Sequence, residues 1–516
     1  MAATDSLCRS FLDLWWHFDP AAATAGRLGD FDPDSIRQHV AALRSISAAV
    51  EELEIEDTAE EIDRTALLDH LRVLLFRFEH EHPYQSNPLL WTEHLATAFA
   101  SPLAAGDGGG GGELAAAAAL ERLRALPGYA RSARASLRRP PLLLIEAALE
   151  QLAFVAGFVE ETGSRFGAVW AAAGGDTTGI MAEAQSALQG FGTALREQIS
   201  PDPDPHAGAI GADEVDRRLH HEHASIHNAA EVWRGALRLA AEVEQEVTAL
   251  AATVDSAKPW RDVYLRVGGG VPRPELTDDF RDALAATRRF ADANGLMSRE
   301  PAGPLEVESL SGAARVLEPV ASYRPGGGDQ APAAVLIGDI PPAAIAWLAA
   351  RLGEPGLHLH ESRVDQLPSL VRRHIAASST PDGWGLYAQE LMVELGYAPE
   401  PASRLVERVL LLREVHLAVV DVGLHTKQLT VEEALGHLAE RIPSDRRTAL
   451  ADARRLLSRP LSACAAILGR QELCRLREDY RAARGTEFGL AGFHEELFSY
   501  GGLPVPLIRW GMGLDA

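Results

Sequence analysis

The sequence predicts an all-α fold with one small β-ribbon near residues 304–340. Apolar residues recur at three- and four-residue spacing over most of the chain, which is the period of a helix with a buried stripe. Two short runs, PLEVESL (304–310) and AAVLIGDI (333–340), contain Val and Ile and are bounded by Pro and Gly. Such runs favour strands, so a helical protein with a small sheet or ribbon is expected.

Long helices are predicted where an apolar stripe continues for several turns. Breaks between them are predicted at GDGGGGG (106–112), PDPDPH (201–206) and PGGG (325–328), because Gly and Pro interrupt helices. Three of the stripes are Leu67, Leu68, Leu71, Leu74, Leu75 and Phe78; Leu237, Leu239, Val243, Val247 and Leu250; and Leu405, Val409, Leu412, Val415 and Val419.

Composition excludes several classes of protein. The 516 residues include 49 Lys and Arg against 73 Asp and Glu, a net charge of −24, which repels nucleic acid. Three cysteines, Cys8, Cys464 and Cys474, do not make a disulfide framework. The N-terminus lacks the basic start and apolar core of a signal peptide, so a cytoplasmic location is expected. No long window is free of charged and polar residues, so no membrane span is expected.

Two possible metal sites follow from histidine spacing. A thermolysin-type site needs His-Glu-x-x-His on one helix, and none of the four His-Glu pairs has the second histidine. His220, His223 and His227 share one stripe if their segment is helical. They either hold zinc with Glu222 nearby or form a solvated polar face. The four His-Glu pairs begin at His80, His221, His360 and His494.

Two later segments carry further candidates. Asp421 interrupts an apolar helical run and His425 follows four residues later, so the two form either a catalytic pair or a satisfied buried contact. In 381–397, Asp382 can cap a helix, whereas Trp384 and Tyr387 fit core packing. His358 and His360, with Glu361 adjacent, are typical of a loop with two surface histidines.

In order along the chain, several segments resemble the domain-of-unknown-function 885 family. The resemblance begins near FLDLWWHFDPAAATAGRLGDFDPDS (11–35) and ends with EFGLAGFHEELFSYGGLPVPLI (487–508). Its best-matching parts are DGWGLYAQELMVELGY (382–397) and VVDVGLHTKQLTVEEAL (419–435). The family is bacterial, all-helical, zincin-like and related to metallopeptidases. The resemblance therefore implies a large two-lobed, neurolysin-like helical fold with a central cleft and metal-dependent hydrolysis of a peptide or amide-like bond.

The chain departs from the family's His-Glu-x-x-Pro-Gly-His-His motif. If Pro355-Gly356 anchors the match, Arg351 replaces the first His, Leu352 the Glu and Leu357 the next His, while His358 is kept. Asp382 and Gln389 replace glutamates of the following segment, and Ala466 stands where a Tyr is common. Leu neither binds a metal nor acts as a base, and Arg repels a cation. A shifted alignment, with His360-Glu361 as the His-Glu, leaves Pro-Gly without a counterpart.

The resemblance implies one lobe over 1–255 and a second over 256–516, with the cleft between the helices that carry 355–394 and 413–430. We expect a pseudo-hydrolase that binds a small molecule or peptide there. The alternatives are an active hydrolase that uses Asp421 and His425, and a non-catalytic interaction protein. Zinc is possible but disfavoured, and the oligomeric state is open. The expected residues are His425, Asp421, Tyr387 and Arg413 for chemistry; Trp384, His360, Glu361 and Tyr500 for substrate; and His358 and Asp382 as weak metal ligands.

Overall fold

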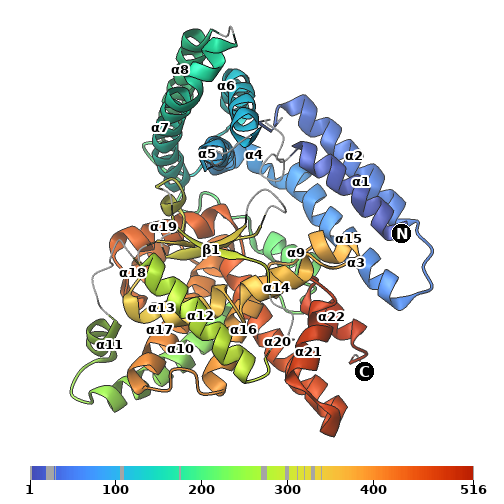
Figure 1. Ribbon diagram of the computed structural model, residues 1–516, viewed down its shortest axis with the longest axis vertical. Coiled ribbons are helices and arrows are strands. Elements are labelled where there is room, and N and C mark those ends of the chain that lie inside the picture. The colour runs from blue at the N-terminus through green and yellow to red at the C-terminus, as the bar shows by residue number, and fades with distance from the viewer. Residues whose placement is uncertain are drawn as a thin grey trace.

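The computed structural model describes most of the chain, and helices dominate it (Figure 1). The predicted all-α class with one small β element is confirmed. The described residues are 3–18, 28–29, 31–104, 110–173, 176–268, 276–296, 302–310, 312–318, 320–326, 332–338 and 340–514.

The first part of the chain folds into helices that pack on one another and begin at acidic caps. Asp32 accepts hydrogen bonds from the first backbone N–H groups of α2, and Asp57 does the same for α3, which satisfies donors that a helix start leaves open. At its end α3 continues into a π-helical turn, η1. These elements are α1 (Ala3–Phe18), α2 (Pro33–Glu51), α3 (Thr58–Phe76), η1 (Arg77–Glu81) and α4 (Pro83–Ser86).

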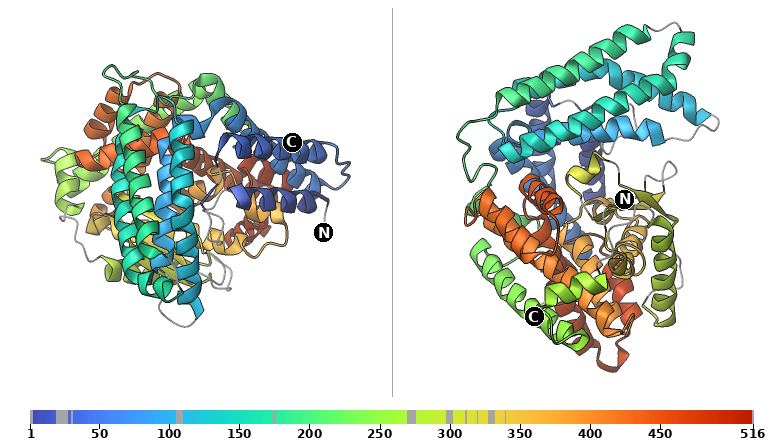
Figure 2. Two further views of the ribbon diagram at one scale, coloured as in Figure 1. Left: turned by 90° about the horizontal axis from the view of Figure 1, so that it is seen from above. Right: turned by 90° about the vertical axis from the view of Figure 1, so that its left-hand side faces the viewer.

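Four helices form a bundle that extends away from the rest of the protein (Figures 1 and 2). They are α5 (Pro88–Ala104), α6 (Gly110–Ser136), α7 (Leu142–Ala172) and α8 (Thr177–Glu197). By length and composition alone, α7 is apolar enough to cross a membrane, with a mean hydropathy of 1.9. The prediction found no such window. Half of this window is buried in the protein, as in the core helix of a bundle.

The next helices return to the main body, where α10 packs along α17. They are α9 (Ala212–His221), α10 (Ala229–Val254), α11 (Trp260–Gly268) and α12 (Thr277–Ala293). Asn228 and Glu231 form a capping box at the start of α10.

The small β element is a three-stranded mixed sheet rather than a two-stranded ribbon. The strands are β1 (Leu305–Ser309), β2 (Ala321–Arg324) and β3 (Ala333–Ile337), in the order β1-β3-β2. β1 runs parallel to β3 with Val307 opposite Val335, and β2 runs antiparallel to β3 with Tyr323 opposite Val335. The short helical turn η2 (Ala314–Val316) lies between β1 and β2.

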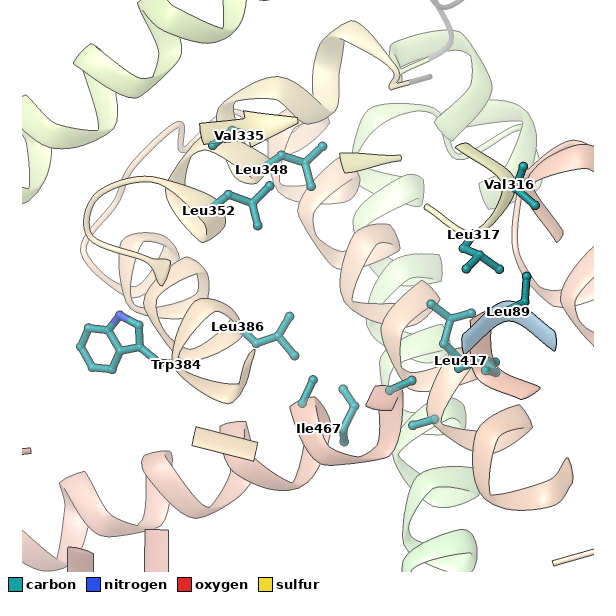
Figure 3. Close-up of a cluster of buried hydrophobic side chains, with 14 of the residues drawn as sticks. Leu89, Val316, Leu317, Val335, Leu348, Leu352, Trp384, Leu386, Leu417 and Ile467 are labelled. Atoms are coloured by element: carbon teal, nitrogen blue, oxygen red, sulfur yellow. The ribbon is translucent and has the colours of Figure 1, made fainter. Parts of the chain in front are cut away.

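The remaining helices build the core of the body. Apolar side chains from the bundle, the sheet and these helices meet in one cluster, which includes Leu89, Leu348, Leu386, Leu417 and Ile467 (Figure 3). The elements are η4 (Pro342–Ala344), α13 (Ile345–Leu352), α14 (Leu357–Val364), α15 (Leu370–His374), α16 (Ser379–Glu394), α17 (Pro401–His425), α18 (Val431–Arg441), α19 (Arg446–Ser458), α20 (Ser462–Arg484), η5 (Gly485–Glu487), α21 (Leu490–Phe498) and α22 (Val505–Gly511).

Candidate functional site around Arg351 and Asp382

Arg351 and Asp382 are placed by tight packing among α13, α16 and α20. α16 and α20 approach so closely that a Cβ on Gly469 would lie 1.6 Å from the carbonyl oxygen of Ser379. A Cβ on Gly383 would lie 2.6 Å from the backbone of Gly469, so both positions require glycine. This contact fixes the first turn of α16, which carries Asp382, against the body of the protein.

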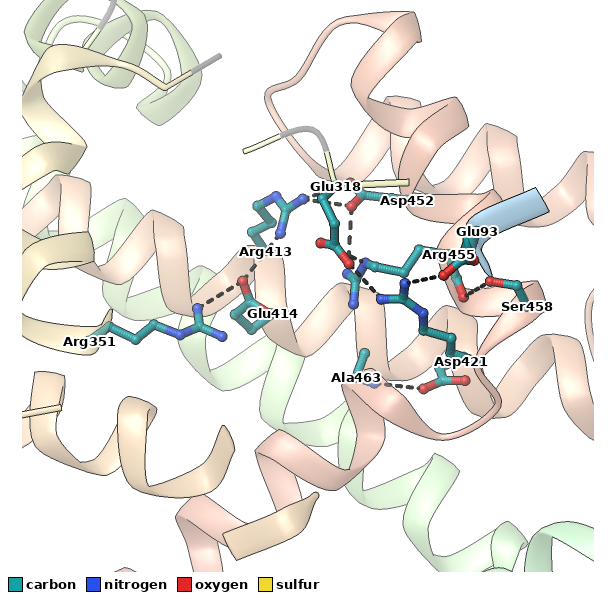
Figure 4. A network of polar contacts seen from close by, with 11 residues as sticks. Glu93, Glu318, Arg351, Arg413, Glu414, Asp421, Asp452, Arg455, Ser458 and Ala463 are labelled. Atoms are coloured by element: carbon teal, nitrogen blue, oxygen red, sulfur yellow. Dashed lines mark hydrogen bonds and ion pairs between the residues drawn. The ribbon is translucent and has the colours of Figure 1, made fainter. Parts of the chain in front are cut away.

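Arginine and acidic side chains alternate through the middle of the body (Figure 4). Arg351 lies 3.0 Å from Glu414, which also accepts a hydrogen bond of 3.2 Å from Arg413. Arg413 donates to both carboxylate oxygens of Asp452, at 2.7 and 2.8 Å. We call this set the central charge network; its members are Glu93, Glu318, Arg351, Arg413, Glu414, Asp452, Arg455 and Arg459.

Glu414 is held in its ionised form by the two arginines. Burial alone would raise the pKa of Glu414, but Arg351 and Arg413 outweigh burial and lower that pKa to about 2. The side chains of Arg351 and Glu414 remain 18% and 14% exposed, so water reaches this part of the network. The pair is therefore charged at neutral pH and accessible from solvent.

Asp382 faces the same charges without a direct partner. Burial raises the pKa of Asp382 to about 6, with Arg351 and Arg455 acting in the opposite direction. In the described part of the chain, its carboxylate has neither a hydrogen bond nor an ion pair. A carboxyl group with this pKa exchanges a proton near neutral pH, which suits acid–base chemistry or ligand binding.

His358 is fully engaged by its surroundings. One ring nitrogen, Nδ1, lies 3.1 Å from the hydroxyl of Tyr323, and Nε2 lies 2.8 Å from the carbonyl oxygen of Gly303. The side chain is buried, and burial lowers its pKa. His358 thus ties α14 to the sheet, and the expected surface loop is wrong because residues 357–364 form a packed helix.

His360 and Glu361 lie together on α14. Nδ1 of His360 is 3.1 Å from Glu361, and its ring packs edge-on against Phe498. His360 has no exposed surface, and its Nε2 has no hydrogen-bond partner among the described residues. Glu361 is near enough to Asp382 to contribute to its raised pKa.

Trp384 and Tyr387 lie in the core, as the helical spacing indicated. The indole nitrogen of Trp384 donates to the carbonyl oxygens of Pro355 and Gly356, both at 3.0 Å. The hydroxyl of Tyr387 is 3.0 Å from Nε2 of His494, and both side chains are buried. Trp384 therefore holds the Pro-Gly turn in front of α14.

Asp421 and His425 are fully buried on α17. Asp421 accepts hydrogen bonds from the backbone N–H groups of Leu461, Ala463 and Cys464, at 2.9, 2.9 and 3.2 Å. These are donors that the start of α20 leaves open, so Asp421 caps that helix from a neighbouring one. His425 Nε2 donates to the carbonyl oxygen of Leu456 at 3.0 Å and lies 3.8 Å from Asp421.

The predicted histidine stripe does not form. α9 ends at His221, and Ala224 adopts a positive φ of 50° before α10 begins. His223 is buried with Nδ1 3.2 Å from the Ser379 hydroxyl, whereas His227 is exposed near Glu231. A stripe requires one continuous helix, so this interpretation is wrong.

The structure brings three of the predicted residues to the central charge network, whereas Asp421 with His425 and Trp384 with Tyr387 form separate contacts. Asp382, Glu361 and Arg413 belong to or adjoin the central charge network, while Tyr500 lies beneath Arg372 near the C-terminus. Sequence reasoning missed the partners of Arg413. The available signal was the charged pair Arg413-Glu414 inside a buried apolar stripe; the members it missed are Glu93, Glu318, Glu414, Asp452, Arg455 and Arg459.

The described residues do not fit a zinc site. No group of three or more His, Cys, Asp and Glu side chains among them is arranged to hold a metal ion. At the family motif, Arg351 contributes a cation, Leu352 and Leu357 have no donor atoms, and both nitrogens of His358 are engaged.

Comparison with known proteins decides the family. A sequence model described as "Bacterial protein of unknown function (DUF885)" matches residues 19–512. The chain belongs to this family. The match spans nearly the whole chain and confirms the resemblance drawn from the residues. None of the curated proteins matches the chain.

Solved structures share the fold of this DUF885 protein. The "putative lipoprotein" from Colwellia psychrerythraea matches with a TM-score of 0.83 at 16% identity, over 99% of both chains. A "putative lipoprotein of unknown function" from Shewanella oneidensis matches with a TM-score of 0.77 at 18% identity, over 99% of this chain and 100% of the other. An M32 carboxypeptidase from Deinococcus radiodurans R1 gives 0.39 at 13% identity, too low for an inference.

The prediction of a cytoplasmic location is wrong on this comparison. The proteins from Colwellia and Shewanella, which share the fold over their full length, are described as lipoproteins. The prediction rested on three cysteines and the character of the first residues. Those features do not distinguish compartments, because single thiols such as Cys8 and Cys464 are simply buried in the core.

Proposed function

We propose that this DUF885 protein has lost metal-dependent hydrolysis and binds a small molecule or peptide at Arg351 and Asp382. The single observation behind the proposal is the ion pair of 3.0 Å between Arg351 and Glu414, at the position where the family motif has a histidine. The guanidinium of Arg351 neutralises the carboxylate of Glu414, whose charge a metal cation would otherwise neutralise.

Electrostatics support this proposal. Arginine stays charged at every physiological pH, so a divalent cation beside Arg351 would meet strong repulsion at short range. The base of the family motif is replaced by Leu352, which is buried and cannot accept a proton. The side chains that would bind the metal electrophile and the side chain that would act as the base are therefore replaced.

The remaining groups favour binding. Arg351 and Asp382 are both partly exposed, and Arg351 is near enough to act on the pKa of Asp382, which burial raises to about 6. A ligand with both an acidic and a basic or hydrogen-bonding group, such as a peptide, would satisfy the two side chains together. Neither residue needs to leave its helix to do so.

Metal analysis tests the proposal directly. The purified protein, incubated with zinc and then dialysed, is expected to retain no stoichiometric metal. A variant that restores the motif, Arg351→His with Leu352→Glu, Leu357→His and Asp382→Glu, is expected to retain about one zinc per chain. Arg459→His, at the far end of the central charge network, is the matched control and should retain none.

The result that overturns the proposal is stoichiometric zinc in the unaltered protein that is lost on Asp382→Ala. Circular dichroism of each variant shows whether it is folded. If the four-residue variant does not fold, Arg351→His alone still tests the proposal, because it removes the cation that repels zinc. This variant should retain measurably more zinc after dialysis than the unaltered protein.

A further inference from the structure

A polar cavity that includes neither Arg351 nor Asp382 lies between the N-terminal helices and α9. Its volume is about 570 Å³, within the usual range of small-molecule sites. One wall is apolar and includes Phe76, Leu144 and Leu457. A charged wall is formed by η1 and α9, and Arg217 lies over the ring of Phe76, 4.0 Å from its centroid.

Two glutamates on the charged wall, Glu81 and Glu214, are bridged by Arg218. Arg218 Nη2 donates to both carboxylate oxygens of Glu81, at 2.7 and 2.5 Å, and Arg218 Nε donates to Glu214 at 3.2 Å. Arg217 donates to the other oxygen of Glu214 at 3.1 Å. Burial and the adjacent Glu81 raise the pKa of Glu214 to about 8, so the pair carries one proton at neutral pH.

Arg77 is the unsatisfied group of this wall. It lies in the π-helical turn η1, a type of turn that often occurs at functional sites. Among the described residues it has no ion-pair partner, and its Nε is buried without a hydrogen-bond acceptor. Glu81, Glu222 and Glu214 are near enough to act on the charge of Arg77 without pairing with it directly. A buried Nε without an acceptor is costly, and the cavity is the place from which a further anion can reach the guanidinium.

We propose that this cavity binds a small carboxylic acid with an apolar body. Arg77 pairs with its carboxylate, and the body packs on Phe76, Leu144 and Leu457. A cation would be repelled by the three arginines of the cavity. Glu81 and Asp213 would repel a dianionic phosphate more strongly than a carboxylate with a single charge. The inference uses other residues than the proposed function and does not depend on it.

Binding of a fluorinated probe tests the inference. 4-Fluorobenzoate, followed by ¹⁹F NMR on the full chain, should bind saturably, and its neutral analogue 4-fluorobenzamide should bind at least tenfold more weakly. Arg77→Gln should weaken binding of the acid at least tenfold. The matched control is Arg72→Gln on α3, since Arg72 is already paired with Glu51 and Asp69 at the surface.

The pH dependence of the affinity for 4-fluorobenzoate distinguishes the effect of Glu214 from that of the other charged groups. Affinity should fall as pH rises from 7 to 9, because Glu214 then loses the proton that it shares with Glu81 and its negative charge repels the carboxylate. Glu214→Gln does not titrate and should flatten the profile. The charged and titratable groups facing Glu214 are Arg77, His80 and Glu81 from η1 and Asp213, Arg217, Arg218 and Glu222 from α9 and its end.

Three results overturn the inference: no saturable binding of 4-fluorobenzoate, equal affinity for the acid and the amide, or unchanged affinity in a folded Arg77→Gln. Circular dichroism checks the fold of each variant. If Arg77→Gln unfolds, Arg77→Lys replaces it and should weaken binding severalfold, because lysine cannot form the two-pronged contact.

Discussion

Two of the acidic residues on helix α17 are used in different ways. Near its middle, Glu414 is bound by the side chains of Arg351 and Arg413 and remains partly exposed. Two turns later, Asp421 is completely buried and is bound by three backbone N–H groups of α20. Both carboxylates lie within a largely apolar run, but Glu414 directly follows Arg413, whereas apolar residues precede and follow Asp421.

This difference distinguishes a carboxylate with a structural role from one that is available to a ligand. A carboxylate that holds backbone groups cannot exchange partners without opening the helix that it caps. A carboxylate held by partly hydrated arginine side chains can release one of them to a ligand. Asp382 belongs with the second type, since Arg351 and Arg455 act on its charge without a direct bond. The predictions below test this distinction.

The largest expected effect is that of Asp421→Ala. It leaves three backbone donors at the start of α20 without an acceptor, and each buried donor costs about 1–3 kcal/mol. The free energy of unfolding should fall by about 3–5 kcal/mol, measured by urea denaturation. Asp421→Asn keeps an acceptor and should lose less. A loss below about 1 kcal/mol for the alanine variant would contradict a capping role.

Asp382→Asn should instead raise the free energy of unfolding, and the size of the increase should depend on pH. The folded-state pKa of Asp382 is about 6, above its ordinary 3.8, so its stabilising protonated form is lost as pH rises through 6. Asparagine mimics that protonated form. The variant should match the unaltered protein near pH 4 and exceed it by up to about 3 kcal/mol at pH 7. Urea denaturation across this range checks the trend, and a destabilised variant at pH 7 would refute it.

Arg351→Gln should cost about 1–2 kcal/mol at neutral pH, because Glu414 keeps Arg413 as a partner. The pKa of Glu414, about 2 in the folded protein, lies below its ordinary 4.5. Its contribution to stability is therefore present above 4.5 and lost as pH falls through 2. The difference between the two proteins should shrink in acid. Arg351→Lys, which keeps the charge, is the control; an equal loss in both variants would indicate a packing effect only.

The helical class was predictable because burial imposes its period on each helix separately. The stripe ending at Phe78, for example, matches α3 and η1. The strand Ala321–Arg324 was not predicted, since ASYR has no Val or Ile run and becomes a strand only by pairing with β3. Long-range pairing of this kind leaves no local pattern.

The candidate site was predictable only in part for the same reason. The motif identified Arg351 and Asp382, because departures from a family pattern are visible in one sequence. The partner Glu414 lies more than sixty residues away, and Asp452 and Glu318 come from two further elements. The role of Asp421 was open because its partners are backbone groups, which carry no residue-type signature.

The smallest effect is expected at the outer end of the central charge network. Arg459 pairs with Glu318 and Glu93 at 2.7 and 2.9 Å, but its side chain is 44% exposed. Exposed pairs are screened by water and salt, so Arg459→Gln should change the free energy of unfolding by less than about 1 kcal/mol, and less still at high salt. Urea denaturation at low and high ionic strength measures this. A loss as large as that of Arg351→Gln would mean that the network acts as one unit, rather than as a hydrated centre with a dispensable edge.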